Sequence, residues 1–228
     1  MLAVSDTSVA SRVRGRVLRS SDRFWRPDDF DGSPAAVAQA LCRLARTGEV
    51  RRLRRGLYWR GASTALGMAP PPSDRFVAEI MDAPGTGPAG SSASLALGLS
   101  TQVPRHETVA VVGRAPRNPG TVRFVSRAAS AKRRDDRLRP AEVALLEVLR
   151  DWSVVVDVPA GRAVGRIRRL VDDGTLRVDR LVRASSTEPP PVRVRLRRLL
   201  VALGRSTAAN AVRQPRSHST LDDGVLAE

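Results

Sequence analysis

The stretch Ser33–Arg60 reads SPAAVAQALCRLARTGEVRRLRRGLYWR and decides the fold of the N-terminal part of the chain. Its first half predicts an amphipathic helix, because Val37, Leu41 and Leu44 recur at helical spacing and form one apolar stripe. Its second half crowds arginines between apolar residues around Gly56, which predicts a β-hairpin with a turn or bulge at that glycine. The stretch therefore predicts one helix that runs directly into a basic hairpin.

The polar face of this helix and the arginines of the hairpin form a candidate DNA-binding surface. In the major groove a glutamine can pair with adenine and an arginine with guanine. Hairpin arginines can hold phosphates and set the register on the duplex. A solvated arginine face is the alternative interpretation of the same charges. The predicted DNA-binding residues are Ser33, Ala36, Gln39, Arg43, Arg46, Arg51, Arg52, Arg54 and Arg55.

The residues upstream complete a known order of elements. A helix with Val9, Val13 and Val17 on one face precedes a short strand or aromatic plug at Phe24–Arg26 and a short helix at Pro27–Phe30. Helix, short strand, short helix, helix and hairpin follow one another in the winged form of the helix-turn-helix. In that fold the third helix enters the major groove and the hairpin lies along the DNA backbone. The N-terminal part is therefore predicted to be a winged helix-turn-helix domain.

The charge of the chain points to a polyanionic partner. The 228 residues have a formal net charge of +16, and Lys132 is the only lysine. Residues 1–68 carry 13 arginines and 6 acids, a net charge of +7, and residues 131–205 carry 18 basic residues and 10 acids, a net charge of +8. The chain thus has two basic regions, and the sequence does not assign a role to the second one.

The predicted fold class is α+β, with four parts along the chain. Residues 1–66 are the winged helix-turn-helix domain and residues 67–73 are a proline-rich linker. Residues 74–205 are expected to form a mixed α/β C-terminal domain. Residues 206–228 carry no apolar stripe, so a disordered tail is expected there.

The C-terminal domain is expected to combine strands and helices. Strands are predicted at 108–113 and 121–127, and helices at 140–152 and 161–171. Residues 192–204 read VRVRLRRLLVALG, in which the second half predicts a helix while the first half alternates as a strand does. Periodicity leaves both interpretations of that first half open.

No catalytic or metal-binding constellation is recognisable. Residues 85–90 match the dinucleotide-binding pattern G-x-G-x-x-G, but a helix is expected before them and Pro88 stands where a helix should open, which favours a flexible loop. The sequence therefore predicts a protein that is not an enzyme and binds no metal or cofactor. Cys42 is the only cysteine, and neither a signal peptide nor a long apolar segment is present, so a cytoplasmic location is expected.

Two blocks of the sequence resemble the AbiEi-type antitoxins of bacterial toxin–antitoxin systems. The first block is the run Arg43–Tyr58. The second is Ala93–Pro104, ASLALGLSTQVP, followed by the strand at 109–113. The helix predicted from residue 140 stands where that family has a short leucine-rich helix. The resemblance covers residues 8–204, and the order of the two blocks is more specific than either block alone.

The resemblance implies a division of labour between two domains. The winged helix would bind double-stranded operator DNA at the protein's own promoter, with an inverted repeat expected, through the basic residues of its helix and hairpin. The second domain would counter a nucleotidyltransferase-like toxin. The hypothesis is therefore a DNA-binding antitoxin that represses its own operon.

Three other functions are compatible with parts of the sequence. The main alternative is a winged-helix transcriptional regulator whose second domain senses a ligand and which has no toxin partner. A nuclease would need a cluster of acids that binds a metal, and none is recognisable. An RNA-binding module would need stacking platforms, and aromatic residues make up only 4% of the chain.

Overall fold

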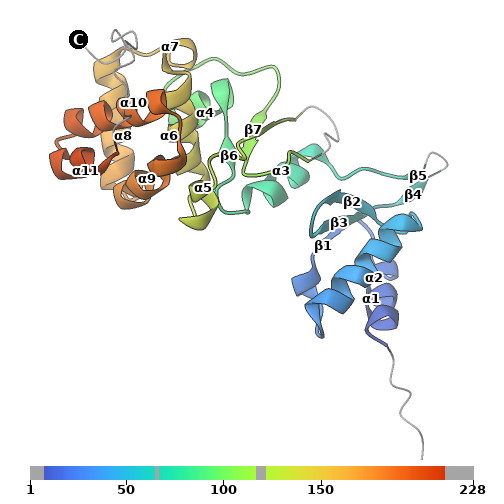
Figure 1. The fold of residues 1–228 in the computed structure, drawn as a ribbon. Helices are drawn as coiled ribbons and strands as arrows, with labels where there is room; N and C mark the ends of the chain where they lie inside the picture. Colours follow the sequence, from blue (N-terminus) through green and yellow to red (C-terminus); the bar gives the residue numbers. More distant parts are fainter. Residues whose placement is uncertain (1–7, 65–66, 117–121, 214–228) are drawn as a thin grey trace, which may run out of the picture. The chain divides into compact units, whose positions relative to one another are not determined.

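The computed structural model describes residues 8–64, 67–116 and 122–213 and shows a mixed α+β protein (Figure 1). The predicted α+β class is therefore confirmed. The chain divides into two compact units, residues 1–76 and 77–228, and each unit has its own hydrophobic core. In the part of the chain described here, no helix is both long enough and apolar enough to cross a membrane.

The first unit packs two helices against a three-stranded antiparallel sheet. Its elements are α1 (Val9–Leu18), β1 (Arg23–Trp25), the 3-10 helix η1 (Pro27–Asp29), α2 (Pro34–Arg46), β2 (Arg51–Arg54) and β3 (Leu57–Arg60). The strand order is β1-β3-β2, and Trp25 lies opposite Tyr58 in the register. Both rings are buried together with apolar side chains of α1 and α2, such as Val17 and Leu41. The sheet therefore covers the apolar faces of the two helices.

Local sequence explains how α2 leads into the hairpin. The helix begins at Pro34, whose missing N–H is not needed in the first turn. It ends just before Gly48, which has a φ of +76°, a conformation that glycine adopts without strain. Gly56, also at +76°, lies in the turn between β2 and β3, and the register shifts between Arg52 and Arg54. The expected helix and the expected hairpin with its turn at Gly56 are both present, and the register shift lies two to four residues before that glycine.

The first unit continues beyond the hairpin. β4 (Ser63–Thr64) pairs with β5 (Gly67–Met68), and α3 (Ser73–Met81) contains the boundary between the units. The indole Nε1 of Trp59 donates a 2.8 Å hydrogen bond to the carbonyl of Ala69, which gives this buried ring a partner. The guanidinium of Arg75 lies 5.6 Å from the centre of the same ring. Residues 67–73, expected to be a linker, thus contribute to the first unit.

The elements of the second unit pack around one central helix, α6 (Pro140–Arg150). The elements of this unit are β6 (Gly87–Pro88), α4 (Gly90–Leu97), β7 (Thr108–Val111), β8 (Arg123–Ser126), α5 (Lys132–Asp135), α6, α7 (Trp152–Val155), α8 (Ala160–Asp172), α9 (Val178–Ala184), the 3-10 helix η2 (Ser185–Thr187), α10 (Pro190–Ala202) and α11 (Ser206–Ala211). Every residue of α6 from Glu142 to Leu149 is buried. The sheet has the order β6-β7-β8, with the first pair antiparallel and the second parallel. The two strands predicted from the sequence are present as β7 and β8.

Two expectations for the second unit are wrong. Residues 85–90, expected to be a flexible loop, include β6, and a Cβ atom at Gly87 would lie only 2.6 Å from the carbonyl oxygen of Pro140. Residues 206–211, expected to begin a disordered tail, form α11 because Ala209 and Val212 are buried in the core. The segment with two interpretations is helical throughout, as part of α10. Residues 214–228 of the expected tail lie outside the described residues.

Candidate nucleic-acid interface

The structure places the nine predicted DNA-binding residues on α2, on the residue that precedes it and on the hairpin that follows it. Seven are exposed and two, Ala36 and Arg54, are half-buried. The exposed residues are Ser33, Gln39, Arg43 and Arg46 at α2 and Arg51, Arg52 and Arg55 on the hairpin. The opposite face of α2 is fixed in the core by Val37, Leu41 and Leu44. The polar face of α2 is thus available to solvent.

Five arginines of this surface are exposed. They are Arg43, Arg46, Arg51, Arg52 and Arg55. Within residues 8–64, 67–116 and 122–213, their guanidinium groups make no hydrogen bond and no ion pair. Each therefore keeps its donors for an external anion, and guanidinium matches phosphate in geometry as well as in charge. Arg54 differs from them because it is already engaged in a contact within the chain.

The turn between α2 and the hairpin is fixed by hydrogen bonds. The carbonyl of Leu44 accepts from the backbone N–H groups of Glu49, at 2.9 Å, and Val50, at 3.3 Å. The Glu49 carboxylate accepts a 2.5 Å hydrogen bond from Arg14 Nη2 of α1, and this contact lowers the pKa of Glu49. The sequence prediction missed Glu49. A signal was present, since it is the only acid in the stretch Ser33–Arg60.

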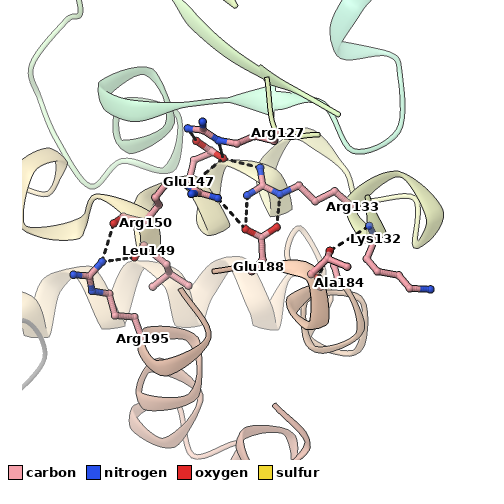
Figure 2. A network of polar contacts seen from close by, with 10 residues as sticks. Arg127, Lys132, Arg133, Glu147, Leu149, Arg150, Ala184, Glu188 and Arg195 are labelled. Atoms are coloured by element: carbon pink, nitrogen blue, oxygen red, sulfur yellow. Dashed lines mark hydrogen bonds and ion pairs between the residues drawn. The ribbon is translucent and has the colours of Figure 1, made fainter. Parts of the chain in front are cut away.

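Much of the second basic region is neutralised inside the second unit. Figure 2 shows Arg133 between two carboxylates, with its Nη1 atom 2.7 Å from Glu147 and its Nε and Nη2 atoms 2.6 and 2.7 Å from Glu188. Arg127 also binds Glu147, through two hydrogen bonds of 2.9 and 2.7 Å, and Arg150 binds Glu188 at 3.3 Å. Arg133 and both glutamates are buried. These cations therefore serve an internal network.

Other arginines of the second unit hold the ends of helices. Helix C-termini expose carbonyl groups without partners in the helix, and cations are favoured near them. Arg168 donates to the carbonyls of Ala202 and Leu203 at the end of α10, at 3.0 and 3.1 Å. Arg195 binds the last carbonyls of α6 through two hydrogen bonds of 2.8 Å, and Arg166 binds the last carbonyl of α4 at 3.1 Å. Net charge alone therefore overstates how much positive charge this region offers to a partner.

The described residues contain no group of three or more histidine, cysteine, aspartate or glutamate side chains placed to hold a metal ion. The two acidic residues at the centre of Figure 2, Glu147 and Glu188, are occupied by arginines. The exposed arginines of α2 and the hairpin have the chemistry to bind an anion such as phosphate.

A model of one protein family matches residues 7–135, more than half of the chain. The chain belongs to DUF6088, a family of unknown function. Among solved structures, the RV2827C protein from Mycobacterium tuberculosis is similar at 20% identity, over 93% of this chain and 85% of that chain, with a TM-score of 0.40. No curated protein matches the chain.

The DUF6088 match includes the whole α2 and hairpin surface but only part of the buried ion network. Arg127 and Arg133 lie within residues 7–135, whereas Glu147 and Glu188 follow them. In this DUF6088 protein the last matched residues are thus held in place by side chains from beyond the match.

Proposed function

We propose that the first unit is a winged helix-turn-helix that binds double-stranded DNA. The observation that carries this proposal is the set of five exposed arginines on α2 and the β2–β3 hairpin that have no partner among the described residues. The order of elements and the antiparallel sheet that ends in a hairpin are those expected of a winged helix. In this proposal α2 lies in the major groove and the hairpin is the wing.

The proposed contacts fall into two classes. Gln39 and Arg43 read base edges from the exposed face of α2, and a well-formed bidentate contact contributes about 1–3 kcal/mol of discrimination against a wrong base. Arg51, Arg52 and Arg55 of the wing hold phosphates and fix the register. Because phosphate contacts release counterions, binding weakens steeply as salt is added.

We further propose that the protein is an antitoxin that represses its own operon and counters a nucleotidyltransferase-like toxin. This step rests on the resemblance of residues 43–58 and 93–104 to AbiEi-type antitoxins. The operator expected from that resemblance is an inverted repeat. A ligand-sensing second domain without a toxin partner is the alternative.

A mobility-shift assay tests the DNA-binding proposal. The full chain and its R51A/R52A/R55A variant are incubated with DNA from immediately upstream of the coding sequence. Wild type is expected to shift this DNA, and the variant is expected to shift it only at much higher protein concentration. A matched control, R105A/R114A/R169A, removes three exposed arginines of the second unit whose side chains have no partner in the described residues. Equal affinity of the wing variant and wild type would refute the assignment of the wing.

Co-expression tests the antitoxin proposal separately. The antitoxin proposal expects a gene for a nucleotidyltransferase-like protein next to the gene for this chain, and that neighbour is expressed with and without the full chain. The proposal expects that this gene stops growth and that the full chain restores it. Loss of DNA binding on addition of a small metabolite, without any rescue of growth, would favour the ligand-sensing regulator instead.

A further inference from the structure

Glu49 joins three elements of the first unit at the point where α2 ends and the hairpin begins. Its carboxylate accepts hydrogen bonds from Arg14 of α1, at 2.5 Å, and from the hydroxyl of Thr47, at 3.2 Å. Its backbone carbonyl accepts a 3.2 Å hydrogen bond from Arg60 Nη1, at the end of β3. Glu49 therefore connects α1 and β3 to the C-terminal end of α2.

The negative charge of Glu49 by itself opposes the proposed binding of DNA. It is the only acid in the stretch Ser33–Arg60, which holds seven arginines. A carboxylate at this place reduces the attraction of the surface for DNA, and its ion pair with Arg14 also neutralises an arginine of α1. Side chains of this pair are 58% and 26% exposed, and exposed ion pairs contribute little to stability. Neither charge nor stability therefore explains what this pair does.

We propose that Glu49 is a positioning residue, which together with Arg14 fixes the wing relative to the helix that reads the bases. This inference rests on the proposed DNA-binding function and deepens it. To read bases, α2 must lie in the major groove, and to contact phosphates, the wing must lie on the DNA backbone. Both contacts form on one duplex only if the angle between α2 and the wing is fixed. The pair thus supports recognition of a specific sequence, while non-specific attraction to phosphate needs no fixed angle.

An effect of charge and an effect of positioning give different results for the single variants. Removing Glu49 raises the net charge of the protein by one, and removing Arg14 lowers it by one. If the pair acted through charge alone, E49A would bind every duplex more tightly and R14A every duplex more weakly. If it acts by positioning, both variants lose preference for the specific sequence. The R14A/E49A variant has the net charge of wild type and isolates the effect of position.

The experiment uses the full chain and two DNA probes. The specific probe is the duplex that wild type selects from a pool of random sequences, and the non-specific probe is poly(dI-dC). Affinity for both is measured at one salt concentration for wild type, E49A, R14A and R14A/E49A. Control variants are R19A and D22N, which change charge by the same amount in the same unit. The side chains of Arg19 and Asp22 make no hydrogen bond within the described residues. Circular dichroism confirms that each variant is folded.

The inference expects the ratio of specific to non-specific affinity to fall about tenfold in E49A, R14A and R14A/E49A alike. The double variant loses no more than either single one, because both remove the same contact. The ratio stays at the wild-type value in R19A and D22N. An unchanged ratio in the double variant overturns the inference, and so does an equal loss of both affinities. If wild type selects no sequence, the proposed function itself fails and this inference falls with it.

Discussion

Arg133 and Glu188 face each other through two parallel hydrogen bonds of 2.6 and 2.7 Å, and their ion pair is fully withdrawn from solvent. The two residues are 55 positions apart in the chain, so the pair fastens α5 to the segment that follows η2. Glu147 of α6 completes the arrangement from the other side, at 2.7 Å from Arg133. Three separate elements of the second unit are therefore joined at one guanidinium group.

Replacement of Arg133 by methionine is expected to destabilise the protein by about 3–5 kcal/mol, because it leaves two buried carboxylates without their shared cation. Urea unfolding followed by circular dichroism measures the effect. The matched control is R134M, because the side chain of the neighbouring Arg134 is 62% exposed. This substitution is expected to change the free energy of unfolding by less than about 0.5 kcal/mol. Equal effects of the two substitutions would show that the buried pair is not important for stability.

The stability of the second unit is expected to fall in acid. Burial alone would raise the pKa of Glu147, but the hydrogen bonds and charges of Arg127 and Arg133 outweigh it, so the pKa is lowered. A carboxyl with a lowered pKa stabilises the folded state above its unfolded pKa, about 4.3 for glutamate, and this stabilisation is lost as the pH falls through the lower folded value. Unfolding free energies measured from about pH 5 downward should therefore decrease.

Glutamine variants identify the group responsible for this decrease. E147Q is expected to be less stable than wild type at neutral pH and to lose less stability in acid, because it no longer titrates. E107Q serves as the control, since Glu107 is exposed and its side chain makes no hydrogen bond within the described residues. An identical acid dependence in wild type and E147Q would contradict the lowered pKa of Glu147.

Two glycines of the second unit are expected to respond to alanine in opposite ways. A Cβ atom at Gly87 would lie 2.6 Å from the carbonyl oxygen of Pro140 and 2.7 Å from the Cβ of Val143, so G87A is expected to cost about 1–3 kcal/mol. Gly165 lies inside α8, exposed, with nothing within 4 Å of the position of a Cβ, so G165A is expected to stabilise by about 0.5–1 kcal/mol. Thermal unfolding measures both. A stabilising G87A would mean that the contact between β6 and α6 is looser than described.

The local features of the first unit could be predicted from the sequence. Helix α2 follows from the spacing of Val37, Leu41 and Leu44, and the hairpin follows from the glycines at 48 and 56. These signals act over a few residues and do not depend on contacts with distant parts of the chain. The exposure of Arg43 and Arg46 follows from the same helical spacing. Neither the half-buried state of Arg54 nor the register shift between Arg52 and Arg54 could be predicted, because no local pattern in the hairpin indicates them.

Features of the second unit that depend on distant contacts could not be predicted. The parallel pairing of β7 with β8 is not encoded in either strand alone. α11 has no apolar stripe, and it is fixed by the burial of Ala209 and Val212 against the rest of the core. The count of arginines in residues 131–205 gave no indication that Arg133, Arg168 and Arg195 bind groups inside the unit.

The salt dependence of DNA affinity tests directly whether the exposed arginines of the wing contact phosphates. Fluorescence anisotropy with a labelled duplex gives the slope of log affinity against log salt concentration. Each phosphate contact contributes about −0.9 to this slope, so R51A/R52A/R55A is expected to be shallower than wild type by about 3. R105A/R114A/R169A is expected to keep the wild-type slope. The same slope in wild type and the wing variant, or an equal loss in the control, would contradict the account.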